Sequence, residues 1–316
     1  MFKTNKKYIL LITIVITIFL AGCGASNTGT SNTGNNGKNE SLKNTTYPLK
    51  LKDSTNKEVT IQSEPKRVVS LSPNFTETIF DLNKQNILVG RTDFCNYPKE
   101  VSKVQSIGTI TDPNVEKIVQ LKPDLVIASN LTKPNNLKKL EQLNIKVLTI
   151  SKRESFENTY SNIEDIGKVL NANEKARSIV SNMKEKVKSV QEKVKDKKSP
   201  TVYYVVSYGT SGDFTAGKDT FIGKMIEMAG GKNAASDVTG WNYSLEKLIE
   251  KNPDVLICFN KFNSKNGIKS TKGYKDLDAV KKNKLFEIDE DIISRQGPRL
   301  ADGLETLAKI IHPEAF

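Results

Sequence analysis

Apolar and polar positions alternate along this chain with two different periods. Short apolar runs, which are typical of buried strands, occupy residues 67–71, 86–91, 125–129, 146–150, 201–207, 255–258 and 285–288. Stretches whose apolar residues recur three or four positions apart predict amphipathic helices between them, at 72–82, 137–143, 220–229 and 300–311. Strands that alternate with helices predict an α/β fold whose sheets are mainly parallel.

One helix-to-strand unit occurs twice in the sequence. The first copy is residues 114–130 (NVEKIVQLKPDLVIASN) and the second is residues 244–260 (SLEKLIEKNPDVLICFN). Each copy begins as an amphipathic helix, breaks at a Pro-Asp turn and continues as an apolar run long enough for a buried strand. Identical residues include the acid near each helix start, Glu116 and Glu246. The repetition predicts two lobes of the same α/β design.

A long helix is predicted between the two copies, because residues 172–195 contain neither Gly nor Pro. Apolar side chains recur along it at Ile179, Met183, Val187, Val190 and Val194. Steps of three and four place them on one face. A helix of this length is about 36 Å long. We interpret it as a rod that joins the lobes and restricts them to small hinge motions; the alternative is a surface helix within one domain.

The first 22 residues have the pattern of a secretory signal peptide. Lys3, Lys6 and Lys7 precede an apolar stretch at 8–20, and small residues follow it. The stretch is shorter than the roughly 20 residues that cross a bilayer as a helix. The signal ends in Leu-Ala-Gly-Cys, which resembles the lipobox of bacterial lipoproteins and implies that Cys23 is lipidated.

The lipidated cysteine and a flexible tether are expected to span residues 23–46. Its sequence after Cys23 is almost entirely Ser, Thr, Asn and Gly, with very little apolar surface to bury. Residues 47–66 then predict an N-terminal hairpin, because two short strands flank the turn sequence Asp-Ser-Thr-Asn-Lys.

Composition limits the kinds of binding site and catalytic site that the chain can have. The chain carries 48 Lys and Arg against 36 Asp and Glu, a net charge of +12. The lysines are dispersed and often stand beside acids, so a solvated surface explains the charge better than nucleic-acid binding. His312 is the only histidine. Its position near the end disfavours a His-rich metal site and the catalytic arrangements of Ser or Cys with His. A hydrolase that uses paired carboxylates stays open.

Several segments together resemble one family. They are residues 67–80 (RVVSLSPNFTETIF), the two Pro-Asp units, 213–237 and 293–300 (ISRQGPRL). The chain resembles the solute-binding proteins of ABC importers that carry cobalamin and ferric siderophores, with an Fe/B12 periplasmic-binding domain at 67–316. The resemblance implies a helical-backbone fold with an N-lobe at 67–154, a connecting helix at 155–197 and a C-lobe at 198–316.

The resemblance also implies the function. The protein is expected to sit on the extracellular face of the cell membrane as a lipid-anchored monomer. It would capture a cobalamin or a ferric siderophore between its lobes and deliver it to an ABC permease dimer with its ATPase. Glu116 and Glu246 match the acids with which this family docks onto its permease. No enzymatic activity, resident cofactor, metal or nucleic acid is expected. The alternatives are a haem receptor of the same fold and the carboxylate-dependent hydrolase.

The ligand is expected between the lobes, at loops that follow strands. The candidates are Phe94, Tyr97, Tyr208, Phe214, Trp241, Tyr243 and Arg295. Aromatic side chains offer flat apolar area to a large planar ligand, and arginine offers a fork of donors to carboxylate or hydroxamate oxygens. Within the resemblance, Ile110 and Ser129 stand where the cobalamin branch has aromatic residues.

Overall fold

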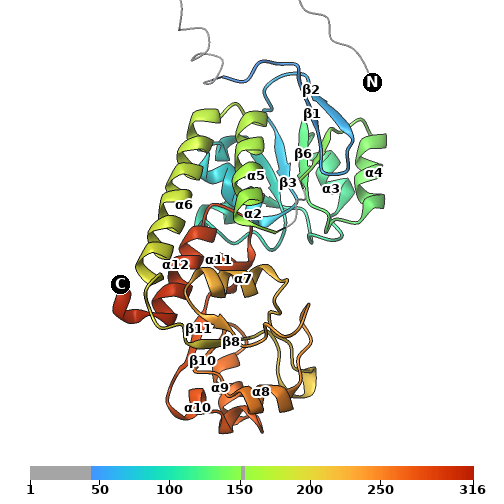
Figure 1. The fold of residues 1–316 in the computed structure, drawn as a ribbon. Helices are drawn as coiled ribbons and strands as arrows, with labels where there is room; N and C mark the ends of the chain where they lie inside the picture. The colour runs from blue at the N-terminus through green and yellow to red at the C-terminus, as the bar shows by residue number, and fades with distance from the viewer. Residues whose placement is uncertain (1–43, 151–153) are drawn as a thin grey trace, which may run out of the picture.

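A computed structural model describes residues 44–150 and 154–316 of the chain as two α/β lobes (Figure 1). In the N-lobe, five strands form a parallel sheet in the order β5-β4-β3-β6-β7. Their bounds are β3 Val68–Ser70, β4 Leu88–Arg91, β5 Gln105–Ser106, β6 Leu125–Ala128 and β7 Val147–Thr149. The fold class predicted from the sequence is therefore confirmed, and β5 is a strand that the pattern did not reveal.

The C-lobe repeats this design with one strand fewer. Its four parallel strands lie in the order β11-β10-β8-β9. Their bounds are β8 Thr201–Val205, β9 Lys232–Asn233, β10 Val255–Phe259 and β11 Leu285–Ile288. The two-residue strands β5 and β9 were missed because a period of two cannot be recognised in so short a run.

Helices cover the two sheets. The N-lobe has α2 Pro73–Asp81, α3 Val115–Gln120, α4 Pro134–Gln142 and α5 Phe156–Val169. The C-lobe has α7 Phe221–Met228, α8 Leu245–Lys251, α9 Ser264–Ser270, α10 Asp278–Lys281, α11 Glu290–Ser294 and α12 Leu300–Ile311. An antiparallel hairpin of β1 (Leu49–Lys52) and β2 (Glu58–Ile61) precedes the N-lobe sheet. No helix within 44–150 or 154–316 is long and apolar enough to cross a membrane.

The repeated unit has the same structure in both lobes. Helices α3 and α8 begin alike, because the side chains of Asn114 and Ser244 accept hydrogen bonds from the backbone N–H three residues later. The alternation of exposed and buried residues is identical along both helices. Each helix then leads through the Pro-Asp turn into a central strand, β6 or β10.

The repeated aspartates close the start of each sheet. Asp124 accepts hydrogen bonds from the backbone N–H of Lys66 and Arg67, just before β3. Asp254 does the same for Thr201 at the start of β8, at 2.8 Å, and also accepts from its hydroxyl. Each aspartate therefore ties its own strand to the neighbouring one.

The hydrogen bonds from Thr201 hold the pKa of Asp254 below its ordinary value. A lowered pKa in the folded state stabilises the protein above pH 4 and loses this effect as the pH falls. We expect Asp254→Asn to lower the free energy of unfolding by up to about 1 kcal/mol at pH 7, since the side chain is solvent-exposed. Urea unfolding at pH 7, 5 and 3.5 should show this difference closing. The exposed Asp196→Asn is the control, and a difference independent of pH would contradict the assignment.

Helix α6 (Asn173–Val194) is the long helix predicted between the repeats. It packs against α5 of the N-lobe and α12 of the C-lobe. Its buried stripe is Ala176, Val180, Met183, Val187, Val190 and Val194. Ile179 of the predicted stripe is partly buried against the same core, while its neighbour Val180, which the prediction omitted, is buried. The segment 155–197 holds two helices, α5 and α6, rather than one.

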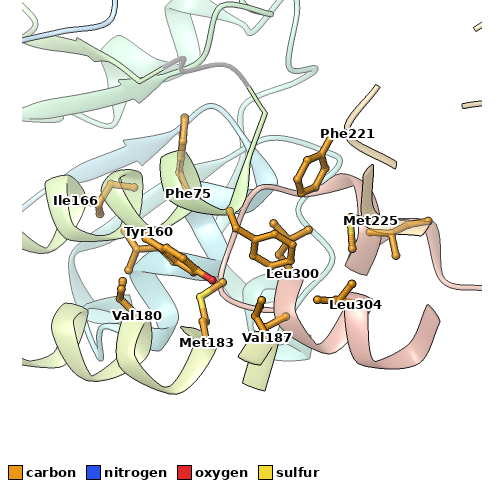
Figure 2. Close-up of a cluster of buried hydrophobic side chains, with 14 of the residues drawn as sticks. Phe75, Tyr160, Ile166, Val180, Met183, Val187, Phe221, Met225, Leu300 and Leu304 are labelled. Carbon is orange, nitrogen blue, oxygen red and sulfur yellow. The ribbon is translucent and has the colours of Figure 1, made fainter. Parts of the chain in front are cut away.

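One cluster of buried apolar side chains runs from one lobe to the other (Figure 2). Met183 and Val187 of α6 lie beside Leu300 and Leu304 of α12, while Tyr160 of α5 reaches the same cluster. The rings of Phe156 on α5 and Phe221 on α7 lie 5.7 Å apart, so the two lobes also touch directly. The lobes therefore share one core in addition to α6.

Candidate functional site between the lobes

A cavity of about 690 Å³ opens between the two lobes. The N-lobe lines it with Ser72, Pro73, Asn74, Phe75, Phe94, Ile110, Ser129, Asn130, Leu131, Ile150, Glu154 and Asn162. The C-lobe lines it with Lys261, Phe262, Glu290, Asp291, Ser294, Arg295 and Gln296. Several of these residues directly follow β3, β6 and β10, because the carboxyl ends of parallel strands meet at one edge of a sheet. The volume suits a ligand larger than a single amino acid or ion.

Two exposed phenylalanines line the cavity, one from each lobe. Phe94 follows β4 and is 56% exposed, while Phe262 follows β10 and is 94% exposed. Phe262 has a left-handed backbone, with φ of +56°, and so does Asn263 after it. A bulky residue rarely adopts this conformation, and such strain is concentrated at functional sites. The two rings offer flat apolar surface on the two sides of the cavity.

The rest of the cavity wall mixes hydroxyl and amide groups with apolar and charged side chains. Lys261 lies 3.2 Å from Glu290 and 3.0 Å from Asp291. Burial raises the pKa of Asp291. The hydrogen bond from Asn96 and the charges of Lys261 and Arg295 outweigh burial and hold this pKa below its ordinary value. Burial raises the pKa of Glu154. The cationic groups described in this wall are thus paired with carboxylates.

The back of the cleft holds a buried charge cluster that joins the lobes. Glu77 of α2 is only 2% exposed. Arg299 forms a bidentate ion pair with Glu77: its Nε donates to Oε2 at 2.9 Å and a terminal nitrogen donates to Oε1 at 2.8 Å. Arg295 donates to the same Oε1 at 2.8 Å. Asn96 and Asp291 complete the cluster, since Asn96 Nδ2 donates to Asp291 at 2.9 Å.

Arg295 uses its terminal donors within the protein. One terminal nitrogen donates to Glu77 and to Asn96 Oδ1, each at 2.8 Å. The other donates to the Phe94 carbonyl at 3.1 Å and lies 2.9 Å from Asp291. A guanidinium whose donors are already paired has little left to offer a ligand. The side chain lines the cavity but holds the lobes together.

The other predicted ligand residues lie outside the cavity wall. Tyr97 stacks under Arg299, whose guanidinium carbon lies 3.9 Å from the ring centre. Tyr243 is 8% exposed and packs against Tyr203, with ring centres 5.5 Å apart. Tyr243 comes directly before the second copy of the repeat, at the position that Pro113, which is also buried, has before the first copy.

The remaining three candidates belong to a loop pair of the C-lobe. Tyr208 packs against Tyr274, with ring centres 6.0 Å apart. Phe214 forms a bridge with Asn242, and Trp241 accepts a backbone hydrogen bond from Thr215 at 2.7 Å. Trp241 is 42% exposed. The structure brings together only Phe94 and Arg295 of the seven candidates.

Sequence reasoning missed several cavity residues. Phe262 lies two positions after the repeated asparagine Asn260, so the repeat itself was the signal that could have found it. Gln296 lies within the quoted segment 293–300 and reaches both lobes, since Asn74 Nδ2 donates to its carbonyl at 3.2 Å. Ile110 and Ser129, where aromatic residues were expected from the resemblance, do line the cavity.

The two repeated acids lie on exposed helix surfaces away from the cavity wall. Glu116 and Glu246 are exposed in the first turns of α3 and α8. Three residues further along, each helix exposes one apolar side chain, Val119 (36%) and Ile249 (47%). Residues three apart share a helix face, so each lobe presents an acid beside an apolar residue. In Figure 1, α3 and α8 lie to the right of α6.

Within residues 44–150 and 154–316, no group of three or more His, Cys, Asp or Glu side chains could hold a metal ion. Two parallel α/β lobes, a helix that packs on both, and a cavity between them define a class of protein: solute-binding proteins with a helical backbone. The sequence comparisons agree with this class. The chain belongs to the periplasmic binding protein family, whose model matches residues 68–292. Members of this family bind solutes and are not enzymes, which removes the hydrolase alternative.

Similar proteins indicate which kind of solute-binding protein this chain is. The ABC transporter substrate-binding lipoprotein YvrC of Bacillus subtilis is 35% identical over 309 residues, which cover 96% of each chain. A cobalamin-binding protein of Halobacterium salinarum is 33% identical over 67% of this chain and 58% of its own length. A solved structure of a possible iron-binding (periplasmic solute-binding) protein from Staphylococcus epidermidis has a TM-score of 0.70 and 31% identity, over 79% of this chain and all of the other. The chain is thus an ABC transporter substrate-binding protein.

Proposed function

We propose that this protein captures a cobalamin or a ferric siderophore in the cavity between its lobes and delivers it to an ABC permease. The observation that carries the proposal is the cavity itself, with an exposed phenylalanine from each lobe and a wall that includes amide and hydroxyl side chains among apolar and charged ones. Relatives named for cobalamin and possible iron binding support both ligand classes.

Cobalamin fits the described wall better than a haem does. A corrin ring has primary amides around its edge, which complement Asn74, Asn130 and Asn162. Proteins hold haem iron through His, Cys, Met or Tyr side chains. None of these residue types occurs among the described residues that line the cavity. This argues against a haem receptor that ligates the iron through a side chain.

The tether and the two acids would place the protein at its permease. We propose that Cys23 carries the lipid anchor on the extracellular face of the membrane, as the lipoprotein relative suggests. Glu116 and Glu246 would then contact cations on two equivalent permease subunits. Exposed ion pairs contribute little free energy and mainly set orientation, so Val119 and Ile249 beside them would supply apolar contact.

Calorimetric titration of the full chain in detergent tests the ligand. The probes are cyanocobalamin, ferric desferrioxamine B, ferric citrate and haemin, with Trp241 fluorescence as a second readout. We expect saturable binding at one site for cyanocobalamin or for the ferric siderophore. The proposal would be contradicted if neither cyanocobalamin nor the ferric siderophore gave a saturable change in heat or in fluorescence. Tight binding of haemin alone would replace it with the haem alternative.

Phe262 should matter to the ligand that binds. We expect Phe262→Ala to lower the affinity for that ligand about tenfold, which corresponds to about 1.4 kcal/mol, because an aromatic face that stacks on the ligand is lost. Phe316→Ala is the matched control: this exposed phenylalanine packs beside Lys193, and it does not line the cavity. Equal affinities for the Phe262→Ala variant and the native chain would show that the strained loop does not contact the ligand.

A further inference from the structure

The charge cluster behind the cavity contains equal numbers of acidic and basic side chains. It contains two carboxylates, Glu77 and Asp291, and two guanidinium groups, Arg295 and Arg299. The formal charges cancel. Glu77 belongs to the N-lobe, whereas the other three belong to the C-lobe, more than 200 positions later in the chain. The cluster therefore crosses the seam between the lobes with no excess charge.

Separation of the lobes at this seam would be costly. A buried charge that loses its partners costs several kcal/mol, because little water reaches it. Glu77 is 2% exposed, and the side chains of Arg295 and Arg299 are 13% and 16% exposed. The bidentate fork of Arg299 also fixes the direction of approach, since both of its bonds require one plane.

Neighbouring contacts extend the seam toward the cavity. Gln296 follows Arg295 directly, and its Oε1 accepts from the Thr159 hydroxyl of α5 at 3.0 Å. Its Nε2 and the Oδ1 of Asn162, which is also on α5, are buried without a hydrogen-bond partner. Thus the charge cluster is fully paired, whereas the amide groups nearer the cavity are not. Buried amides without partners are costly, so pairing these two groups would stabilise this part of the seam.

We propose that Glu77, Arg295 and Arg299 form a positioning cluster that sets the separation of the lobes and hence the width of the binding cavity. The inference rests on the proposed function only in its last step, the effect on ligand affinity. The arginines act through the lobe geometry, because Arg299 does not line the cavity and Arg295 lines it with its terminal donors already paired within the protein. The two phenylalanines, Phe94 and Phe262, are then held at a fixed distance across the cavity.

The test measures lobe separation and affinity in the same variants. Spin labels at Lys138→Cys on α4 and Lys269→Cys on α9 report the distance between the lobes. Cys23→Ser prevents labelling at the N-terminus, and Cys95 and Cys258 are buried. We expect Glu77→Gln to broaden the distance distribution and lengthen its mean by several ångströms. Affinity for cyanocobalamin or ferric desferrioxamine B should fall at least tenfold.

Glu64→Gln is the matched control, because Glu64 pairs with Lys84 and Asn171 inside the N-lobe. It should leave the distance distribution unchanged. Arg299→Lys keeps the charge but loses the fork, and a smaller broadening is expected. It carries the test if Glu77→Gln does not fold.

An unchanged distance distribution in the folded variants would overturn the proposal. If, in addition, Glu77→Gln bound ferric citrate more tightly, the freed arginines would contact anions directly. If none of the probes binds to the native chain, the proposed function fails, but the distance measurement still decides whether the cluster positions the lobes.

Discussion

Reversal of both repeated acids, Glu116→Arg with Glu246→Arg, is expected to abolish uptake while ligand affinity stays within about twofold of the native value. The two acids are exposed and lie outside the cavity wall, so ligand binding does not depend on them. The new arginines would face the cations of the permease, and such repulsion at an interface costs several kcal/mol, which is enough to prevent docking. Uptake of labelled ligand by cells that carry only the variant measures the first effect, and calorimetry measures the second.

The matched control is Glu250→Arg, which reverses another exposed acid on α8 at a position where the first repeat has Gln120. Uptake should continue with this variant. Each single reversal should lower uptake less than the double one, because one lobe keeps its contact. Full uptake by the double variant would show that α3 and α8 do not face the permease.

Ser189→Pro is expected to lower the free energy of unfolding by about 3 kcal/mol and to weaken ligand binding at least tenfold. Ser189 lies on the exposed face of α6, so the substitution leaves the core side chains in place. Proline removes the hydrogen bond from residue 189 to the carbonyl four residues back and bends the helix. The bend falls beside α12, where α6 packs on the C-lobe, and would misalign the cavity walls.

Ser189→Ala is the control, since alanine preserves the helix and should raise stability by a few tenths of a kcal/mol. Urea unfolding measures stability, and titration with the ligand that binds to the native chain measures affinity. Loss of stability without loss of affinity would show that α6 supports the fold but does not set the relation between the lobes.

The fold was predictable because its signals are long and periodic. Seven apolar runs and the stripe along α6 depend only on local spacing, and the repeat adds a comparison within one chain. The cavity was harder to predict. Aromatic residues in loops, such as Tyr243 and Tyr208, were expected at the ligand because aromatics favour binding sites, but both pack against other tyrosines.

Charge pairing explains why the role of Arg295 in joining the lobes was not predicted. A sequence shows that an arginine is present and that Asp291 stands four residues before it, but its partner across the lobes, Glu77, lies 218 positions away, and no local pattern connects those two. The repeat could have located Phe262, but its left-handed backbone could not be predicted, because backbone conformation at one residue depends on the strand and helix on either side.

The apolar core that runs through both lobes has a consequence for how binding specificity can change. Each lobe has an apolar cluster of its own, but another part of its apolar surface is buried only in the cluster that the two lobes share. The chain should therefore unfold in a single cooperative transition, and exchange of a whole lobe between relatives would leave mismatched residues in the shared cluster. Recognition of a new nutrient is more readily reached by altering the loops at the cavity rim, which can vary while the common interior stays the same.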